Sequence, residues 1–431
     1  MSRETWIRFA ALYVPLTAAL LAGLLRRKAT RRGAACLLSL VWAMISLLVL
    51  QRVNQWAGWW SFEASGASFR GMPVELYMGW VLLWGAVPEL LFVRTRVAWA
   101  AVTMAVVDLL AMPLCKPVVV LGAHWLIGES AGVLMVLLPA LYLARWTMED
   151  SQLRLRAGMQ VAMAGGLVLF FLPEMIFALR PGQGWNALME RPVWERDLCA
   201  VLLLAAALPG VAAVMEFAER GAGTPIPYDP PKRLVVSGIY RYLANPMQLS
   251  CLVVMVMWAG WLRNGWMAAA AGMSVIYSVG LARWDVGEVL KRRFGAEWIL
   301  YRASVRNWVP RWRPYCAGAA SRIYMAATCG PCSELRAWLE ARHPLGVEFI
   351  DAETLPYGSI QRMRYVPGDG GAGVDGVRAV GRVLEHMNLA WALAGGPMRL
   401  PVVWQVVQLV TDASGLGPRV VGSRCETNPP R

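Results

Sequence analysis

Two cysteines near residue 330 have the spacing of a thiol–disulfide centre. In Cys329-Gly330-Pro331-Cys332 the second cysteine follows the first by three residues, close to one turn of a helix. A thiolate at a helix N-terminus lies at the positive end of the helix dipole, which lowers the pKa of the thiol and makes it a better nucleophile. Cys329 is therefore the candidate nucleophile. Cys332 is the candidate resolving thiol, which would release a mixed disulfide.

The segments around this motif predict a strand, a helix and a second strand. Residues 322–328 (RIYMAAT) are apolar and strand-like, residues 333–342 (SELRAWLEAR) have helical spacing, and residues 347–353 (VEFIDAE) resemble a strand again. This order favours redox chemistry over a metal site. Zinc would need two more ligands, and neither a second Cys-x-x-Cys nor a pair of histidines is present. A cysteine pair without redox activity, in a degenerate domain, stays open as an alternative.

The C-terminal region resembles the DCC family of thiol-disulfide oxidoreductases, which are thioredoxin-like and named for an Asp-x-x-Cys-x-x-Cys signature. Residues 376–419 look like the C-terminal half of that family, and the likeness covers most of 321–422. The signature aspartate is replaced by Ala326, while Gly330-Pro331 is similar to thioredoxin itself. The resemblance implies a redox-active dithiol that acts on a protein or small-molecule disulfide. In the cytoplasm such a pair would be mostly reduced, which favours a reductant or a sensor.

The composition of the whole chain indicates a multi-span membrane protein. The chain has 431 residues, of which 57% are hydrophobic and 16% charged. Soluble proteins carry about 25% charged residues. Basic loops at an anionic cytoplasmic leaflet account for the net charge of +14, so we expect no nucleic-acid partner.

About nine apolar segments have a length that suits membrane spans. We place them at 6–25, 35–51, 73–92, 97–114, 128–145, 157–179, 198–216, 247–262 and 265–282. Loops rich in Arg and Lys follow alternate segments, from the first to the ninth. By the positive-inside rule the N-terminus lies outside and the C-terminal domain in the cytoplasm of a bacterial inner or plasma membrane. Some acidic residues fall inside these segments and either pair across helices or mark a functional path, among them Glu75, Glu89, Asp108 and Glu174.

A second motif brackets the last two apolar segments. Its first block runs from Gly238 through Tyr240-Arg241-Tyr242 to Asn245-Pro246, and its second block holds Phe294-Gly295, Trp298, Tyr301 and Val309-Pro310-Arg311-Trp312. Residues 223–315 thereby resemble the isoprenylcysteine carboxyl methyltransferase and phospholipid methyltransferase superfamily. The resemblance implies S-adenosylmethionine as cofactor and a membrane lipid or a prenylated, lipophilic molecule as methyl acceptor. It assigns the cofactor contacts to Tyr240, Arg241, Tyr242, Asn245, Pro246, Glu288 and Arg311.

The methyltransferase-like motif is altered at several positions. The family pattern of Arg, then His or Asn, then Pro-x-Tyr-x-Gly has lost its Arg, Tyr and Gly to Ala244, Gln248 and Ser250. The two carboxylates expected before Phe294 are replaced by Val286 and Gly287. These changes leave two interpretations open, an active methyltransferase and a scaffold that has lost its cofactor.

These patterns predict an α-helical membrane protein with a C-terminal cytoplasmic thioredoxin-like α/β domain. We divide the chain into an N-terminal bundle of unassigned role (1–200), a methyltransferase-like domain (201–317) and a dithiol domain (318–431). Three functions follow. The first is a methyltransferase joined to a thiol-disulfide oxidoreductase, the second is the oxidoreductase on an inactive methyltransferase-like scaffold, and the third is a transporter with a regulatory redox domain.

Overall fold

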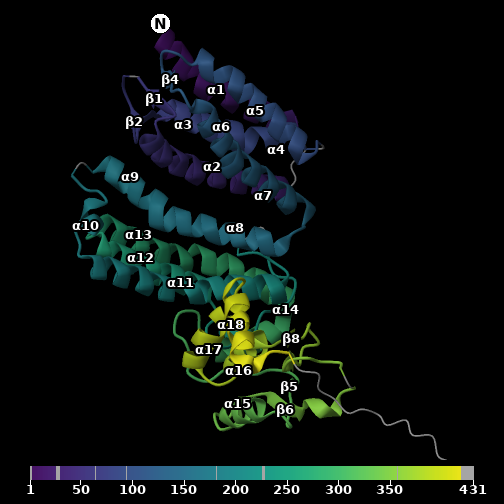
Figure 1. The fold of residues 1–431 in the computed structure, drawn as a ribbon. Helices are drawn as coiled ribbons and strands as arrows, with labels where there is room; N and C mark the ends of the chain where they lie inside the picture. The colour runs from purple at the N-terminus through teal and green to yellow at the C-terminus, as the bar shows by residue number, and fades with distance from the viewer. Residues whose placement is uncertain are drawn as a thin grey trace, which may run out of the picture. The chain divides into compact units, whose positions relative to one another are not determined.

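The computed structural model describes residues 2–25, 30–63, 65–93, 95–180, 182–225, 229–356 and 358–418. It is mostly helical, with a small mixed sheet near the C-terminus (Figure 1). Two compact units make up the chain. The first comprises Met1–Asn186 with Ile226–Asp229, and the second comprises Ala187–Pro225 with Pro230–Arg431.

The first unit consists of apolar helices with two short β-ladders. Its helical segments are α1 (Arg3–Leu25), α2 (Thr30–Ala57), α3 (Val74–Val81), η1 (Leu82–Ala86), α4 (Val87–Leu91), α5 (Val97–Leu114), α6 (Trp125–Gly132), η2 (Val133–Leu137), α7 (Leu138–Glu149), α8 (Leu153–Gly166), η3 (Leu167–Phe171) and α9 (Leu172–Leu179). Antiparallel ladders join β1 (Trp60–Phe62) to β4 (Val119–Leu121), and β2 (Ser68–Phe69) to β3 (Met72–Pro73). The short helix α10 (Asn186–Met189) then leads into the second unit.

Three of the long apolar helices contain a π-helical turn just before a proline. Two residues after the turns η1, η2 and η3 come Pro88, Pro139 and Pro173, each the second residue of the next α-helical segment. Proline has no N–H and its ring clashes with the carbonyl four residues earlier. A wider turn accommodates that ring, so these helices continue across the proline instead of ending there.

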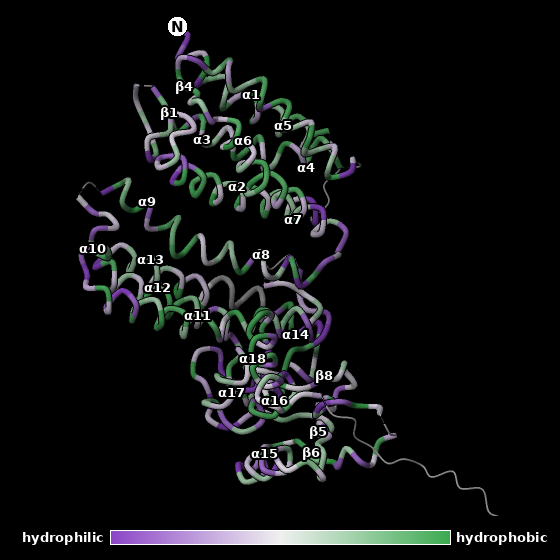
Figure 2. Tube along the Cα trace, viewed as in Figure 1, coloured by the Kyte–Doolittle hydropathy of each residue, from purple (hydrophilic) through white to green (hydrophobic). Residues whose placement is uncertain are grey.

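Seven helices in the described part of the chain are long and apolar enough to cross a membrane. They are Arg3–Leu25, Arg31–Ala57, Val74–Leu91, Val97–Leu114, Trp125–Glu149, Leu153–Leu179 and Val193–Gly221, and Figure 2 shows their hydrophobic character. The first seven predicted spans are therefore confirmed as candidate membrane helices, which supports an integral membrane protein. Length and composition thus support seven of the nine predicted spans. The eighth and ninth segments form α12 (Pro246–Trp261) and α13 (Gly265–Val279), with 16 and 15 residues, fewer than the about 20 that a spanning helix needs.

The helices α12 and α13 form a hairpin that packs along α11 (Val193–Gly221) (Figure 1). The Ser250 hydroxyl donates to the carbonyl of Ala206 (2.5 Å), and Arg191 donates to the carbonyl of Trp261 (3.1 Å). The turn of the hairpin thus lies beside the first residues of α11.

The C-terminal domain is a four-stranded sheet with helices packed on it. The strands β5 (Ser321–Met325), β6 (Val347–Asp351), β7 (Arg364–Val366) and β8 (Val374–Asp375) take the order β6-β5-β7-β8. β5 and β6 are parallel, with Ser321 opposite Val347, and the other pairs are antiparallel. The helices are α15 (Gly330–Glu340), α16 (Val377–Leu384), α17 (Leu389–Gly395) and α18 (Val403–Thr411), with shorter turns at η5 (Ala352–Thr354), η6 (Pro397–Arg399) and η7 (Asp412–Leu416).

Local predictions for this domain agree with the structure. The predicted strands at 322–328 and 347–353 correspond to β5 and β6, and the helix between them is α15. The apolar stretch 386–410 forms two short helices, α17 and α18. The core of the domain combines residues of the sheet and of its helices: Ile323, Met325, Leu339, Tyr365, Ala379, Val383, Leu384 and Met387.

Two elements connect the membrane helices with this domain. The turn η4 (Gly238–Arg241) precedes α12, and α14 (Leu281–Ser304) follows α13. α14 is interrupted at Gly295, whose φ of 51° and ψ of −122° lie outside the helical region. A glycine adopts such a positive φ without the steric cost that a side chain would add.

Candidate functional site

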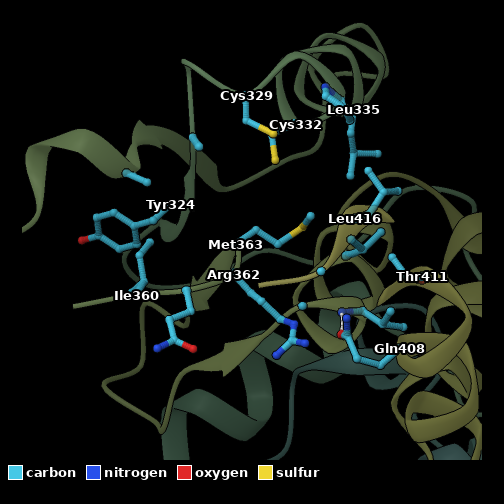
Figure 3. Close-up of a pocket in the computed structure, with 18 of the residues that line it drawn as sticks. Tyr324, Cys329, Cys332, Leu335, Ile360, Arg362, Met363, Gln408, Thr411 and Leu416 are labelled. Atoms are coloured by element: carbon cyan, nitrogen blue, oxygen red, sulfur yellow. Dashed lines mark hydrogen bonds between the residues drawn. The ribbon is translucent and has the colours of Figure 1, made fainter. Parts of the chain in front are cut away.

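The cysteine pair lies where β5 meets α15. Cys329 is the N-cap residue of α15, with φ −98° and ψ 113°, and Cys332 lies in the first turn. Both side chains are half-buried, and Figure 3 shows their sulfur atoms close together beside a cavity. The predicted position at a helix N-terminus is confirmed, while the redox role stays a prediction.

Glu353 holds the loop that leads into Cys329. Its carboxylate accepts hydrogen bonds from the backbone N–H groups of Ala327 and Thr328 (3.1 Å each) and from the Thr328 hydroxyl (2.9 Å). Partial burial would raise the pKa of Glu353, but these donors stabilise the carboxylate and hold its pKa at about 2. A negative charge therefore lies next to the cysteine motif, although the signature position holds Ala326.

Sequence analysis did not single out Glu353, yet a signal for it existed. β5 and β6 are neighbouring parallel strands, and the C-terminal ends of parallel strands meet at one edge of the sheet. The motif follows β5, and Glu353 follows β6 by two residues. A polar residue at the end of the second predicted strand was thus a candidate for contact with the motif.

A cavity of about 400 Å³ opens beside the cysteines. Thr328, Cys329 and Cys332 line one part of it, and Arg362, Gln408 and Thr411 add polar groups elsewhere (Figure 3). The remaining lining is largely apolar and includes Ala326, Pro331, Leu335, Ile360, Met363, Val377, Val380, Met398, Val407 and Leu416. One wall comes from α18 and η7, which lie far along the chain from the motif.

The second predicted site, here named the docking loop (residues 238–245), turns towards the C-terminal domain. Tyr240 and Tyr242 are buried, and the Tyr242 hydroxyl donates to the carbonyl of Glu385 (3.0 Å). Arg241 donates to the carbonyl of Tyr315 (3.0 Å) and lies 3.2 Å from the ring of His386. Three of the predicted cofactor residues are thus in contact with other parts of the same chain.

The two blocks of the methyltransferase-like motif meet at this loop. The Tyr301 hydroxyl donates to the carbonyl of Tyr240 (2.8 Å), and the backbone N–H of Arg311 donates to the carbonyl of Tyr242 (3.0 Å). The N–H of Ala244 also donates to the carbonyl of Arg306 (2.9 Å). The two blocks therefore pack together after the intervening hairpin, as two halves of one site would.

The other predicted cofactor residues lie around this junction. Asn245 is the N-cap of α12 and makes no side-chain capping bond there, and Pro246 is the first residue of that helix. Glu288 is exposed on α14, before the interruption at Gly295. The side chain of Arg311 donates to the carbonyl of Ser304 (3.3 Å). Asp285, Val286 and the start of α14 lie among residues whose side chains are outside the described part.

His386 connects the docking loop with the core of the C-terminal domain. Its Nδ1 lies 2.7 Å from the carbonyl of Leu345, and its Nε2 faces Arg241 and the hydroxyl of Tyr365 (2.9 Å). Arginine can only donate, so Nε2 is the acceptor and Nδ1 carries the proton. Burial, and then the charge of Arg241, lower the pKa of His386 well below its usual value, which keeps the ring neutral.

A buried ion cluster, not predicted from the sequence, joins α11 to the C-terminal domain. Glu216 has 0% of its surface exposed and accepts hydrogen bonds from Arg382 (2.7 Å) and Arg399 (2.7 Å). The same two arginines also contact Glu385, at 3.3 Å and 2.5 Å. Two carboxylates compensate two guanidinium groups, which is the condition under which buried charges are tolerated.

The acidic residues inside the apolar segments mostly have partners within the first unit. Glu75 pairs with Arg8 (2.9 Å), and the buried Glu174 pairs with Arg52 (2.5 Å). The Trp80 indole donates to Asp108 (2.8 Å). For these three residues the predicted pairing between helices is confirmed. Glu89 is also buried.

No protein-family model, curated protein or solved structure matches this chain. The resemblances to the DCC family and to the membrane methyltransferases therefore rest on the residues quoted above.

Proposed function

We propose that this protein is a membrane-anchored thiol-disulfide oxidoreductase, whose C-terminal domain carries the reaction and whose methyltransferase-like region is the scaffold that holds it. The observation that carries the proposal is the contrast between the two motif loops. The cysteines are half-buried beside a cavity, whereas the side chains of the docking loop are engaged within the chain.

The position of Cys329 supports a nucleophilic role. As N-cap of α15 it lies at the positive end of an 11-residue helix, which favours the thiolate. The thiolate attacks one sulfur of a substrate disulfide, forms a mixed disulfide and releases the other substrate sulfur as a thiolate that takes up a proton. The Cys332 thiol loses its proton and attacks Cys329. This step closes the Cys329–Cys332 disulfide and releases the second substrate thiol.

Disulfide reduction by the purified full-length protein tests this proposal. The protein is purified in detergent, reduced, freed of reductant and mixed with hydroxyethyl disulfide, and the substrate thiol is followed in a single turnover. We expect Cys329→Ser to lower the rate at least about a thousandfold, because the nucleophile is lost. Cys316→Ser, which alters an exposed thiol outside the motif, should react like the wild type. A wild-type protein no faster than Cys329→Ser would contradict the proposal.

The full chain is the right material for this assay. Arg382 and Arg399 belong to the C-terminal domain but share their buried cluster with Glu216 of α11. A fragment that starts near residue 318 would lack Glu216 and leave two buried guanidinium groups with one carboxylate. Inactivity of such a fragment would then reflect misfolding and not the chemistry of the cysteines.

A second candidate is methyl transfer from S-adenosylmethionine to a lipophilic acceptor. One observation favours it, namely that the two motif blocks pack together through Tyr240, Tyr242 and Tyr301. The assigned side chains fit the cofactor poorly in this arrangement, since Tyr240 and Tyr242 are buried and Arg241 is engaged. Calorimetric titration of the full chain with millimolar S-adenosylmethionine tests binding, with Asn245→Ala as the variant. Heat of binding that Asn245→Ala removes would support this candidate, and no heat would exclude it.

A further inference from the structure

We propose that the dithiol acts on a small disulfide with an apolar body and a carbonyl or carboxylate group at its far end. This inference rests on the proposed oxidoreductase function and names its substrate class. The probe that matches this description is lipoamide. It carries a five-membered cyclic disulfide, a short alkyl chain and a terminal amide.

The size and lining of the cavity favour a small molecule over a protein disulfide. A volume of about 400 Å³ falls in the range of roughly 300–1,000 Å³ that is typical of small-molecule sites. Cys329 and Cys332 both line the cavity, so a ligand within it reaches the sulfur atoms. The other lining side chains are mainly aliphatic or thioether groups, which would bury an alkyl chain: Leu335, Met363, Val380, Met398, Val407 and Leu416.

Polar groups lie away from the sulfur atoms. Figure 3 shows Arg362 and Gln408 across the cavity from the cysteines, with Met363 in between. Among the described residues Arg362 donates only to Asp412, through Nη2, so Nη1 keeps its donors. Gln408 donates to Asp412 (2.8 Å) and accepts from the N–H of Val377 (2.9 Å).

Arg362 and Gln408 form the polar end of the cavity, and the net charge there predicts which hydrogen-bond acceptor of a substrate it would bind. Asp412 compensates the charge of Arg362, so the end offers N–H donors without a net positive charge. Such a site suits a neutral carbonyl at least as well as a carboxylate. We therefore expect lipoamide to be reduced no less efficiently than lipoic acid, and both far more efficiently than oxidised glutathione, which is polar and has no alkyl chain to bury.

The reaction follows the dithiol exchange given above. Cys329 opens the cyclic disulfide to a mixed disulfide, Cys332 closes the protein disulfide, and dihydrolipoamide leaves with both electrons and two protons. A second dithiol, supplied in the assay as dithiothreitol, returns the protein disulfide to the reduced state in a separate step. Single-turnover rates of the pre-reduced protein avoid any direct reaction of dithiothreitol with the probe.

Two neighbouring valines of α18 provide a matched test. Val407 lines the cavity, whereas Val406 is 53% exposed and is not part of the lining. Val407→Trp should fill the cavity and lower kcat/KM for lipoamide by about tenfold or more, since hydrophobic pockets discriminate roughly 10–200-fold by small differences in size. Val406→Trp should leave this value unchanged. Hydroxyethyl disulfide, which needs no cavity, should react equally with both variants.

A second pair of variants tests the polar end without relying on the first. Arg362→Met combined with Asp412→Asn removes the donor without leaving an unpaired carboxylate, and we expect KM for lipoamide to rise about fivefold while kcat stays the same. Arg364→Met, which alters a half-exposed pair with Asp375 (3.8 Å), is the control.

The outcomes separate this inference from the proposed function. A wild-type protein that reduces hydroxyethyl disulfide, but whose lipoamide kinetics do not change in Val407→Trp or in the Arg362 variant, overturns the inference and leaves the oxidoreductase intact. A wild-type protein that reduces neither disulfide overturns the proposed function itself. Selective loss of lipoamide reduction in both cavity variants supports both.

Discussion

The docking loop and the segment 326–332 around the two cysteines, called the cysteine loop, are the two motifs that could do chemistry. Their side chains have different surroundings in the structure. Each lies just before a helix, α12 in one case and α15 in the other. In the docking loop, Tyr240 and Tyr242 are buried and Arg241 donates to a backbone carbonyl. At the cysteine loop, both thiols line an open cavity of about 400 Å³.

This difference shows that the residue types of a motif do not by themselves make a binding site. A ligand needs donors that are not already satisfied and a space in which to meet them. The docking loop has used several of its polar groups to hold the C-terminal domain. At the cysteine loop, Glu353 fixes the backbone before Cys329, and both thiols line the cavity.

The largest expected effect is a loss of stability at the ion cluster between α11 and the C-terminal domain. Glu216→Gln leaves Arg382 and Arg399 with one fully buried carboxylate, Glu385, and should lower the free energy of unfolding by about 3–5 kcal/mol. Denaturant titration of the detergent-solubilised protein measures it. Glu219→Gln is the control. Its side chain is 22% exposed and lies 3.9 Å from Arg382, so a change under about 1 kcal/mol is expected. Equal effects of the two variants would argue against the cluster.

The second prediction concerns how the free energy of unfolding depends on pH through His386, which contacts the docking loop. The pKa of His386 is lowered by burial and by Arg241, so the unfolded chain binds a proton near pH 6.5 that the folded protein does not. The stability is therefore present above pH 6.5 and falls as the pH decreases, by at most about 1.4 kcal/mol per pH unit. Unfolding free energies of wild type and His386→Gln between pH 7.5 and 5 test this, since the variant should lack this part of the decline. Identical slopes would show that His386 does not carry the effect.

A smaller effect is expected from one hydroxyl of the docking loop. Tyr242→Phe removes the hydrogen bond to the carbonyl of Glu385 and should lower the free energy of unfolding by about 1–2 kcal/mol, because the carbonyl is buried. Disulfide reduction should continue at the wild-type rate. The control is Tyr277→Phe, which alters a 58% exposed tyrosine of α13. A large loss of activity in Tyr242→Phe would mean that docking and chemistry are coupled.

The smallest expected effect is a shift in the pKa of the Cys329 thiol. Glu353→Gln removes a negative charge beside the loop, which should lower the pKa of the Cys329 thiol, because like charges oppose ionisation. The pH profile of alkylation by iodoacetamide measures this shift, with Glu348→Gln on β6 as an exposed control. An unchanged alkylation profile would contradict the charge effect.

The low pKa of Glu353, about 2, also predicts a contribution to stability that is complete above pH 4.5 and lost as the pH falls towards 2.

Local patterns in the sequence determined much of this protein. Apolar stretches of sufficient length predicted seven candidate membrane helices, because hydropathy over about 20 residues is a property of neighbouring residues alone. The strand and helix around Cys329 were likewise predicted from periodicity, and β5 and α15 confirm them. The eighth predicted segment, 247–262, has the length of α12, whereas the ninth, 265–282, extends three residues beyond the end of α13 at Val279.

Only the tertiary structure decided which polar groups meet. Glu216 and Arg382 are 166 residues apart in the sequence, and Tyr242 and Glu385 are 143 apart. No local pattern predicts such contacts, because each group is satisfied equally well by water until the fold brings its partner close and excludes solvent. For the same reason the sequence offered both the docking loop and the cysteine loop as candidate sites. Burial then engaged the polar groups of the docking loop and left a cavity beside the cysteines.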